Sequence, residues 1–431
     1  MSFASPTTWH GMNRILHLGI GHFHRAHQAW YTHAANAAGE ARWRITGVSL
    51  RSASVRDALA PDRFAYTLAV ADADGETLHR VDVVDDVLVA PEDPEKVTAA
   101  IADPSVALVT LTVTEKGYAL GADGRLALES PEVVGDLEAL RTGEPPATAI
   151  GFLVAGLARR AAHGAPVTVL SCDNLPGNGE KLARAVREAA RTVGLDAAAF
   201  ESPAVTFPSS MVDRITPAAD EALRTRIAAT ELPAAAPVAT ESFSEWVIED
   251  DFAGSRPPWE TAGVVFTDDV APFERRKLRL LNGAHSYLAY AGTLAGHQFV
   301  HEAIADPVLR AGTLALMDEA ATTLVGAVRD GADTYRAALL ERFANPALAH
   351  RLRQIAMDGS LKLPIRVLET RAARAADGLA SPACDTVLEA WHTFLAAEFT
   401  AGRTVDDPAA ERLRRGIEAG DDALGLLERV A

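Results

Sequence analysis

The chain has 431 residues, of which 48% are apolar and 23% are charged, so it is long enough for two domains and has the composition of a soluble globular protein. Its formal net charge of −17 argues against nucleic acid or an anionic membrane surface as a partner, although it leaves room for a local basic pocket. The two cysteines form no CxxC pair, no apolar run approaches the roughly 20 residues that span a bilayer, and residues 1–13 lack a signal-peptide pattern. We therefore expect a cytoplasmic protein that acts on a small molecule.

A short apolar strand, residues 14–18, leads into a glycine-containing turn, and residues 25–38 then have the pattern of a helix. This order is that of a dinucleotide-binding fold, in which glycines let a pyrophosphate approach the N–H groups at a helix start. His24 stands where the third glycine of the usual fingerprint would be, so the match is partial. The cofactor-binding residues that we predict here are Gly19, Ile20, Gly21, Phe23, His24 and Arg25.

The same turn contains three histidines, His22, His24 and His27, at a spacing that also occurs in metal sites. Histidines at a helix start beside glycines more often cap the helix or contact phosphate, and no carboxylate or thiol nearby completes a ligand set. We therefore expect no metal.

A second strand, residues 43–50, ends at Arg51. An NAD-selective site usually has Asp or Glu at this strand end to bind the ribose 2′-hydroxyl, whereas Arg suits a 2′-phosphate. We predict that Arg51 contacts the cofactor, and the sequence leaves the choice between NAD and NADP open.

The rest of the first half continues an α/β pattern. Residues 64–70 and 78–89 alternate like strands and are compatible with a hairpin that extends the sheet, and residues 121–146 are turn-rich and acidic. The other elements that we predict are helices at 94–101 and 148–162, buried strands at 106–113 and 166–170, and later strands at 246–250 and 264–266.

Polar residues cluster where two of the buried strands end. Residues 114–118 follow one strand and residues 171–179 follow the other, which is the edge at which open α/β sheets bind ligands. Asp213, within residues 208–217, is a further candidate: it either supplies a carboxylate to the same cleft or forms a surface pair with Arg214.

The sheet-forming pattern stops near residue 268, and the composition then becomes rich in Ala, Leu and Arg with helical periodicity. We therefore predict two domains, a dinucleotide-binding domain at residues 1–268 and a helical domain at residues 269–431. The latter contains a glycine-to-proline break, residues 358–366, whose Lys362 and Arg366 are candidates for binding a carboxylate or sugar hydroxyls.

The start of the second domain has an amine, an amide and an imidazole at Lys277, Asn282 and His285. On a continuous α-helix these side chains would lie at about 0°, 140° and 80°, and so share one broad face. Only five of the 41 basic residues are Lys, and Lys can lose a proton where Arg cannot. This set is suited to proton and hydride transfer on an alcohol.

Five motifs, in order along the chain, go beyond such spacing. They are Gly-Ile-Gly-His-Phe-His-Arg-Ala-His-Gln at 19–28, Thr-Val-Thr-Glu-Lys-Gly-Tyr at 112–118, Ser-Cys-Asp-Asn at 171–174, Met-Val-Asp-Arg-Ile-Thr-Pro at 211–217, and Lys277, Asn282 and His285. Together they resemble the mannitol dehydrogenase family of long-chain, zinc-independent polyol dehydrogenases, and residues 354–366 extend the match. The resemblance implies a Rossmann-type α/β domain with a mostly parallel sheet, a mainly α-helical second domain, and NAD(P)-dependent interconversion of a secondary alcohol and a ketone.

The resemblance also implies roles for single residues. Lys277 is the expected general base, Asn174 and Asn282 the oxyanion-stabilising pair, and His285 the residue that orients the sugar. A lysine desolvated in such a site can have a pKa near about 7–8, at which it takes a hydroxyl proton as hydride leaves.

Further roles follow from the same match. Glu115 and Glu274 occupy acidic positions through which the family passes the proton from the lysine to solvent. Asp213, Lys362 and Arg366 are the substrate-binding residues that we predict.

Other reductase classes fit the sequence less well. A short-chain dehydrogenase needs Tyr-x-x-x-Lys, and a zinc alcohol dehydrogenase needs a ligand set that two isolated cysteines do not readily supply. No tyrosine lies four residues before any of the five lysines, because those positions are Glu92, Thr112, Gly177, Phe273 and Asp358.

The substrate is less well defined. Mannitol 2-dehydrogenases tend to have Arg where this chain has Gln354, and residues 354–366 look closer to fructuronate reductases, which reduce a keto-uronate to mannonate. We favour a sugar acid, with a polyol such as mannitol, arabinitol or sorbitol as the alternative. The chain is shorter than expected for a fructuronate reductase, which is compatible with a trimmed loop near the pocket.

A hypothesis of another class is a nucleotide-binding sensor without turnover. The intact Lys277, Asn282 and His285 argue against it. We expect a monomer or a weak homo-oligomer.

Overall fold

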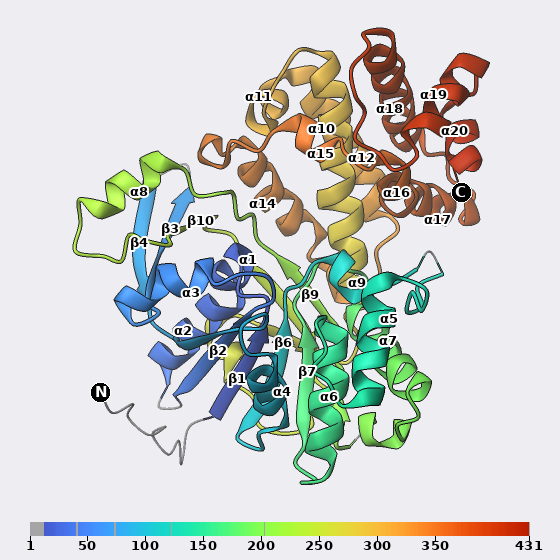
Figure 1. Ribbon diagram of the computed structural model, residues 1–431. Coiled ribbons are helices and arrows are strands. Elements are labelled where there is room, and N and C mark those ends of the chain that lie inside the picture. The colour runs from blue at the N-terminus through green and yellow to red at the C-terminus, as the bar shows by residue number, and fades with distance from the viewer. Residues whose placement is uncertain (1–12, 40–41, 73–74, 122, 202, 431) are drawn as a thin grey trace. The chain divides into compact units, whose positions relative to one another are not determined.

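The computed structural model describes residues 13–39, 42–72, 75–121, 123–201 and 203–430 (Figure 1). The chain divides into two compact units, one that ends at Val270 and one that begins at Ala271. No helix among the described residues is long and apolar enough to cross a bilayer.

A six-stranded parallel sheet, in the order β5-β2-β1-β6-β7-β8, forms the centre of the first unit (Figure 1). The strands are β1 (Asn13–Leu18), β2 (Trp43–Ser49), β5 (Val84–Val89), β6 (Val106–Leu111), β7 (Val167–Ser171) and β8 (Val205–Thr206). The strand order reverses between β1 and β6, so the carboxyl ends of these two strands flank the topological switch point at which such sheets bind ligands.

Both faces of this sheet are buried. Neighbouring residues alternate between two cores: Leu16 and Val109 lie in one, and Ile15 and Leu108 lie in the other. The first core includes residues of α4 (Pro94–Ala102), α5 (Pro131–Thr142), α6 (Ala149–Ala161) and α7 (Asn178–Thr192). The second includes residues of α1 (His22–Ala26), α2 (Gln28–Ala38), α3 (Ser54–Leu59) and two small sheets. The continuous apolar runs of the parallel strands are explained by this burial on both sides.

The predicted hairpin forms, but it does not extend the central sheet. β3 (Tyr66–Asp72) and β4 (Gly75–Val81) pair antiparallel and join β10 (Val238–Glu241) in a separate sheet. The run 78–89 contains two strands, because its first part belongs to β4 and pairs with β3 whereas β5 pairs with β2. The third sheet, β12-β11-β9, contains β9 (Ser210–Asp213), β11 (Glu245–Glu249) and β12 (Val265–Thr267).

Two local predictions are corrected. The acidic segment 121–146 contains the helix α5, whose N-cap Ser130 accepts a hydrogen bond from the Val133 N–H and is followed by Pro131 at the first helical position. The helix predicted at 25–38 is two helices, because His27 leaves the helical region with φ −113° and ψ −90°.

The second unit is helical (Figure 1). Its elements are α9 (Ala271–Arg276), the π-helix η5 (Lys277–Asn282), α10 (Gly283–Leu294), α11 (Val300–Ala305), α12 (Pro307–Ala321), α13 (Gly326–Asp330), α14 (Ala332–Ala344), the 3₁₀ helix η6 (Pro346–Leu348), α15 (Leu352–Ile355), α16 (Gly359–Leu363), the π-helix η7 (Pro364–Leu368), α17 (Glu369–Ala376), α18 (Pro382–Thr400), α19 (Ala410–Ala419) and α20 (Ala423–Val430). Helix α10 packs against α11, α12, α15 and α18 and is almost wholly buried, as its apolar sequence requires. The predicted fold class, a Rossmann-type α/β domain followed by a helical domain, is confirmed.

A buried carboxylate near the end of α18 holds α15 in place. Glu398 accepts two hydrogen bonds from Arg353, at 2.8 and 3.1 Å, and two from Arg403, at 2.9 and 2.7 Å. The Arg403 and Arg353 guanidinium groups lower the pKa of Glu398 to about 2. Two bidentate pairs of this kind are the strong form of a charged contact.

Candidate functional site

The turn after β1 brings the chain close to the end of β6. Gly19 has a φ of +100°, and a Cβ at this position would lie 2.2 Å from the Thr112 carbonyl oxygen. The Thr112 hydroxyl donates to the Gly19 carbonyl at 2.7 Å, and the Gly19 N–H donates to the Val48 carbonyl at 2.9 Å. Glycine is required here because both the φ and the close approach exclude a side chain.

Gly21 is the N-cap residue of α1 and is exposed. The atom nearest to a Cβ built there is the Gly19 carbonyl oxygen, 3.9 Å away, so the outer side of the turn is open. No side chain among the described residues caps α1, and the N–H groups of its first turn remain available to an anion. A dinucleotide pyrophosphate uses this feature.

His24 lies inside the unit rather than on its surface. Its ring stacks on that of His17 with a centroid distance of 3.5 Å. His17 Nε2 lies 2.8 Å from the Thr112 hydroxyl, which itself donates to Gly19, so Nε2 is the donor and Nδ1 accepts from Thr110 at 2.7 Å. Burial lowers the pKa of His17 to about 3 and that of His24 well below its usual value, so both rings are neutral. His24 therefore packs helix against strand where the usual fingerprint has a glycine.

Two more of the predicted cofactor residues also make packing contacts. Ile20 is buried, and a Cβ on Gly47 would lie 2.4 Å from its Cδ1 atom, so the two residues pack closely. Phe23 is half-buried and stacks on the His27 ring at 5.1 Å.

Arg25 ties α1 to a distant segment. Its guanidinium donates to the Ala236 carbonyl at 2.6 Å and to the Gly21 carbonyl at 3.3 Å, and lies 5.5 Å from the centre of the Tyr66 ring. Burial lowers the pKa of Arg25 from its usual value. The structure thus gives this arginine a role in holding the turn in shape.

Arg51 is exposed just beyond the end of β2. The Ser49 hydroxyl donates to the Ser52 carbonyl at 2.6 Å and closes a short turn around it. Residues 49–54 contain no carboxylate, so the group that this strand end offers to a ribose is a guanidinium.

One buried carboxylate joins the polar clusters that follow β6 and β7. Asp173 accepts hydrogen bonds from the Val113 N–H at 3.0 Å, the Thr114 N–H at 2.9 Å and the Tyr118 hydroxyl at 2.8 Å. The Tyr118 hydroxyl also lies 2.5 Å from the Ser171 hydroxyl. Burial raises the pKa of Asp173, and the three donors oppose that shift. The ends of two neighbouring strands are therefore fixed to each other.

This arrangement brings two predicted catalytic residues to one edge of the sheet. Glu115 directly follows Thr114, Asn174 directly follows Asp173, and both side chains are exposed. Asn178 anchors the second loop, because its amide donates to the Asp173 carbonyl at 3.0 Å and to the Ser210 carbonyl at 2.8 Å. Asp173 and Asn178 were not among the predicted site residues, since Asp and Asn in a loop usually indicate only a turn.

Asp213 is the last residue of β9 and is buried, with 4% of its surface exposed. Arg214 is also buried and donates to the Glu241 carbonyl at 3.0 Å and to the Ala26 carbonyl at 2.5 Å. Burial lowers the pKa of Arg214 to about 10. The alternative of a surface Asp–Arg pair is therefore wrong.

In the second unit, Lys277, Asn282 and His285 lie on one continuous helical run formed by α9, η5 and α10. The run is not an α-helix throughout, because residues 277–282 form a π-helix. Its hydrogen bonds join residue i to residue i+5, so Lys277 and Asn282 lie at the two ends of one wide turn and nearly above each other. The separation of about 140° that we derived for an α-helix is corrected, and the two side chains are closer to one face.

His285 is buried against Phe343 and His350, with ring centroids 4.7 and 5.4 Å away. Burial lowers its pKa well below the usual value, and the neighbouring His350, Arg342, Arg366 and Lys277 act in the same direction, so the ring is neutral. Its Nε2 atom has no hydrogen-bond partner among the described residues. A neutral imidazole with a free nitrogen can hold a ligand hydroxyl.

Lys277 is half-buried, and so is Glu274. Glu274 lies three residues earlier on the same helical run, the spacing at which helical side chains are neighbours.

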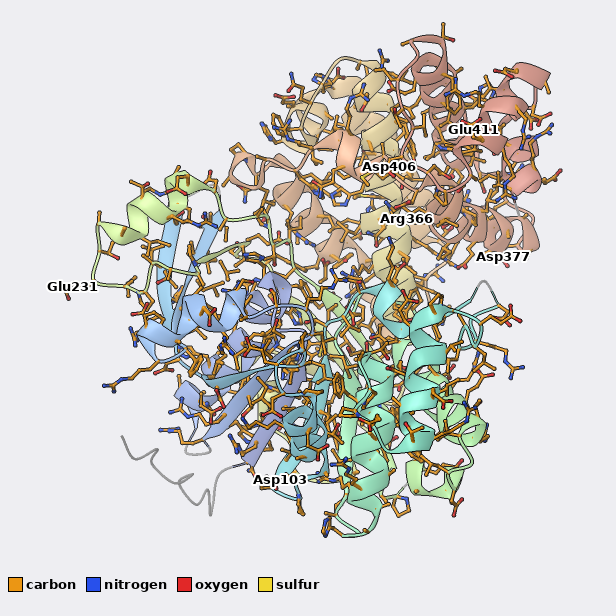
Figure 2. All side chains as sticks on the ribbon, in the orientation of Figure 1. Asp103, Glu231, Arg366, Asp377, Asp406 and Glu411 are labelled. Carbon is orange, nitrogen blue, oxygen red and sulfur yellow. The ribbon has the colours of Figure 1, made fainter. Side chains whose placement is uncertain are left out.

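The two cations of the later stretch have different surroundings. Arg366, labelled in Figure 2, lies on η7, which packs against η5, and its guanidinium donates to the Ser286 hydroxyl at 3.1 Å. Ser286 in turn donates to the Asn282 carbonyl at 3.1 Å. Lys362 instead donates to the Met357 carbonyl at 2.7 Å. The Arg366 guanidinium therefore hydrogen-bonds to the helix that contains His285.

The three histidines considered for a metal do not converge. His22 is exposed, the His24 ring stacks on His17, and His27 Nε2 lies 3.2 Å from the Glu245 carbonyl oxygen. Within the described ranges, no group of three or more His, Cys, Asp or Glu side chains is arranged to hold a metal ion.

Comparison with known sequences covers both units. The profile described as Mannitol dehydrogenase Rossmann domain matches residues 13–261, and the profile described as Mannitol dehydrogenase C-terminal domain matches residues 269–429. D-mannonate oxidoreductase of Escherichia coli strain K12 is 42% identical over 368 residues, which are 83% of this chain and 74% of the relative. Mannitol 2-dehydrogenase of Pyrenophora tritici-repentis is 38% identical over 426 residues, 95% and 75% of the two chains.

A solved structure is similar over nearly the whole length. Mannitol 2-dehydrogenase of Pseudomonas fluorescens, in a ternary complex with NAD and D-mannitol, matches with a TM-score of 0.82 at 36% identity. The match covers 97% of this chain and 86% of that protein.

Proposed function

Because this chain belongs to the mannitol dehydrogenase family of oxidoreductases, we propose that it interconverts a secondary alcohol and a ketone on a sugar acid or a sugar alcohol, with NAD as cofactor. The observation that carries the proposal is that both domain profiles match and that Lys277, Asn282 and His285 lie on one helical run.

The first unit has features that fit a dinucleotide. Gly21 leaves the outer side of the turn open, and the first turn of α1 can receive a pyrophosphate. A bound nicotinamide supplies the hydride acceptor or donor. NAD is favoured by the complex of the Pseudomonas fluorescens relative, and the exposed Arg51 makes NADP the alternative to test.

We assign the acid–base chemistry to residues of this chain. Lys277 takes the proton of the reacting hydroxyl during oxidation and returns it during reduction. Asn174 and Asn282 donate hydrogen bonds to the oxygen as negative charge develops on it. The free Nε2 of His285 holds the reacting hydroxyl in place.

The proton then has to reach solvent. Glu274, three residues before Lys277, and the exposed Glu115 are the carboxylates that we assign to this transfer.

For the substrate we favour a hexuronate–aldonate pair, fructuronate and mannonate. The 42% identity to a D-mannonate oxidoreductase supports it, and so does a guanidinium at Arg366 that can bind a carboxylate. Buried Asp213 is the second substrate-binding residue in this proposal. A neutral polyol remains the second candidate, because mannitol 2-dehydrogenase is 38% identical over 95% of this chain.

The direct test is to follow NADH or NADPH oxidation by the purified protein with fructuronate, fructose, and other keto-sugars. We expect turnover with NADH and at least one of these substrates. Cofactor binding without turnover of any substrate would instead support a nucleotide sensor, and Lys277→Ala is the inactive reference.

A further inference from the structure

Thr114, between the predicted Glu115 and the end of β6, has an unusual backbone conformation. Its φ of +66° and ψ of 165° lie in a region that is essentially restricted to glycine. A residue with a Cβ stays there only when the surrounding structure holds it. The Thr114 side chain is exposed, so its own packing does not supply that restraint.

Asp173 supplies it. One carboxylate oxygen accepts from the Thr114 N–H at 2.9 Å, and the other accepts from the Val113 N–H at 3.0 Å and from the Tyr118 hydroxyl at 2.8 Å. Asp173 is 9% exposed, and all three donors are uncharged groups of the loop after β6. A carboxylate has two acceptor oxygens with several lone pairs, so this one side chain can hold both backbone N–H groups and the hydroxyl at once.

We propose that Asp173 is a positioning residue that holds Thr114 in its glycine-like conformation and so fixes Glu115 relative to Asn174. The inference rests on the proposed function, in which these two residues pass the proton and stabilise the oxyanion. Without the carboxylate the loop relaxes to an ordinary conformation, and only a fraction of the molecules keep Glu115 in place.

The test is a double-mutant cycle of Asp173→Asn and Thr114→Gly, with kcat, KM and the dissociation constant of NADH measured for all four proteins. Asn has nearly the same size but keeps only one acceptor oxygen, so it cannot satisfy both backbone N–H groups and the Tyr118 hydroxyl in this geometry. We expect Asp173→Asn to lower kcat by about 10-fold or more, within the factor of roughly 5 to 150 that one strained residue represents. The dissociation constant of NADH should change by less than about 3-fold in this variant.

Glycine adopts this conformation without restraint. In the Thr114→Gly background the effect of Asp173→Asn on kcat therefore falls below about 3-fold, a rescue that a merely structural role does not give. An equal loss of kcat in both backgrounds, or wild-type kcat in Asp173→Asn, overturns the proposal. If Asp173→Asn does not fold, Tyr118→Phe removes one of the three donors, and its smaller loss of kcat must likewise shrink in the Thr114→Gly background.

The melting temperature of the same four proteins separates this proposal from the proposed function. If the wild type reduces none of the sugars, the proposed function fails, and the melting temperatures alone decide whether Asp173 restrains Thr114. If the two substitutions have non-additive effects on the melting temperature but additive effects on kcat, the contact is purely structural and the positioning role is overturned.

Discussion

Arg366 and Lys362 show how differently two cations of one stretch can be placed. Arg366 hydrogen-bonds to Ser286 on the helix of the candidate catalytic residues, whereas Lys362 hydrogen-bonds within its own loop, to the Met357 carbonyl. The sequence predicted both as substrate-binding residues, because both are cations of the same glycine-to-proline break. The difference depends on the directions in which the side chains of η7 and α16 point, and the sequence pattern does not predict these directions.

Arg366→Leu should therefore separate the two substrate classes. A charged hydrogen bond contributes roughly 1.5–3 kcal/mol, so we expect kcat/KM for fructuronate to fall by about 10- to 150-fold and that for fructose to fall far less. The measurement is the ratio of the two kcat/KM values in wild type and variant.

Lys362→Met is the matched control for this substitution, because it removes a cation of the same stretch that is held by a backbone carbonyl. We expect the ratio to stay near its wild-type value. If both variants lose the two activities equally, the stretch binds hydroxyls or is structural, and the polyol becomes the better substrate.

Lys277→Ala tests the base. We expect kcat to fall by at least about 10², the scale of lost general catalysis, while NADH binding is retained. Lys277→Arg should not restore turnover, because a guanidinium stays protonated. Lys96, an exposed lysine paired with Asp93, provides the control substitution Lys96→Ala. Retained activity in Lys277→Ala would rule out this assignment.

The residues of the glycine turn show the limit of prediction at this scale. The pattern predicted Gly19 as a cofactor-binding residue, and the structure shows that only glycine fits at this position. It did not indicate that His24 and Arg25 point inward, because their inward partners, His17 and the Ala236 carbonyl, come from β1 and from a segment more than two hundred residues away. From sequence alone, polar residues at the start of a helix suggest ligand contacts, because the protein groups that they bind inside the fold are not known.

At the scale of elements, the π-helix is the main departure from the sequence prediction. Helical periodicity predicted one continuous run, and α9, η5 and α10 form it. The wide turn was not predictable from periodicity, since a π-helix changes the spacing by a fraction of a turn over six residues. The same holds for the second π-helix, η7.

The contact of Glu398 with Arg353 and Arg403 predicts an acid-sensitive link between α15 and α18. The pKa of Glu398 is lowered from a usual value of 4.5 to about 2, so its contribution is complete above pH 4.5 and is lost as the pH falls toward 2. We expect Glu398→Gln to lower the free energy of unfolding by on the order of 2 kcal/mol at pH 7.

Urea unfolding at pH 7 and at pH 3 measures this effect. The difference between wild type and Glu398→Gln should shrink at pH 3, because below pH 4.5 the unfolded wild-type chain binds a proton at this carboxylate while the folded protein does not. A difference that is the same at both pH values would show that the substitution acts through packing rather than charge.

At the scale of the whole molecule, the two-part fold was predictable because it follows from composition and periodicity. Alternating burial of Ile15 and Leu16 toward opposite cores is what a strand buried on both faces requires. The separate sheet of β3, β4 and β10 was not predictable, because β10 lies far along the chain and its parallel pairing with β3 is a long-range contact.

Cofactor choice can be measured as stability. A ligand that binds only the folded protein stabilises it by about 2.7 kcal/mol at a hundredfold excess over its dissociation constant. We expect NADH to raise the melting temperature of the wild type. Arg51→Ala should reduce the stabilisation by NADPH and leave that by NADH unchanged, because only NADPH has a 2′-phosphate for this guanidinium. An equal loss with both cofactors would place Arg51 away from the ribose.

The π-helix at 277–282 has a consequence for how this chain can change by descent. A π-turn contains one residue more than the α-turn it replaces, so deleting a single residue there can restore an ordinary helix while α9 and α10 keep their packing. Lys277 and Asn282 would then be four residues apart, about 40° on an α-helix, so the amine and the amide would still share one face. A descendant that lost one codon between them would therefore keep both the helical unit and this pair, whereas straightening the turn without a deletion would leave the two side chains about 140° apart.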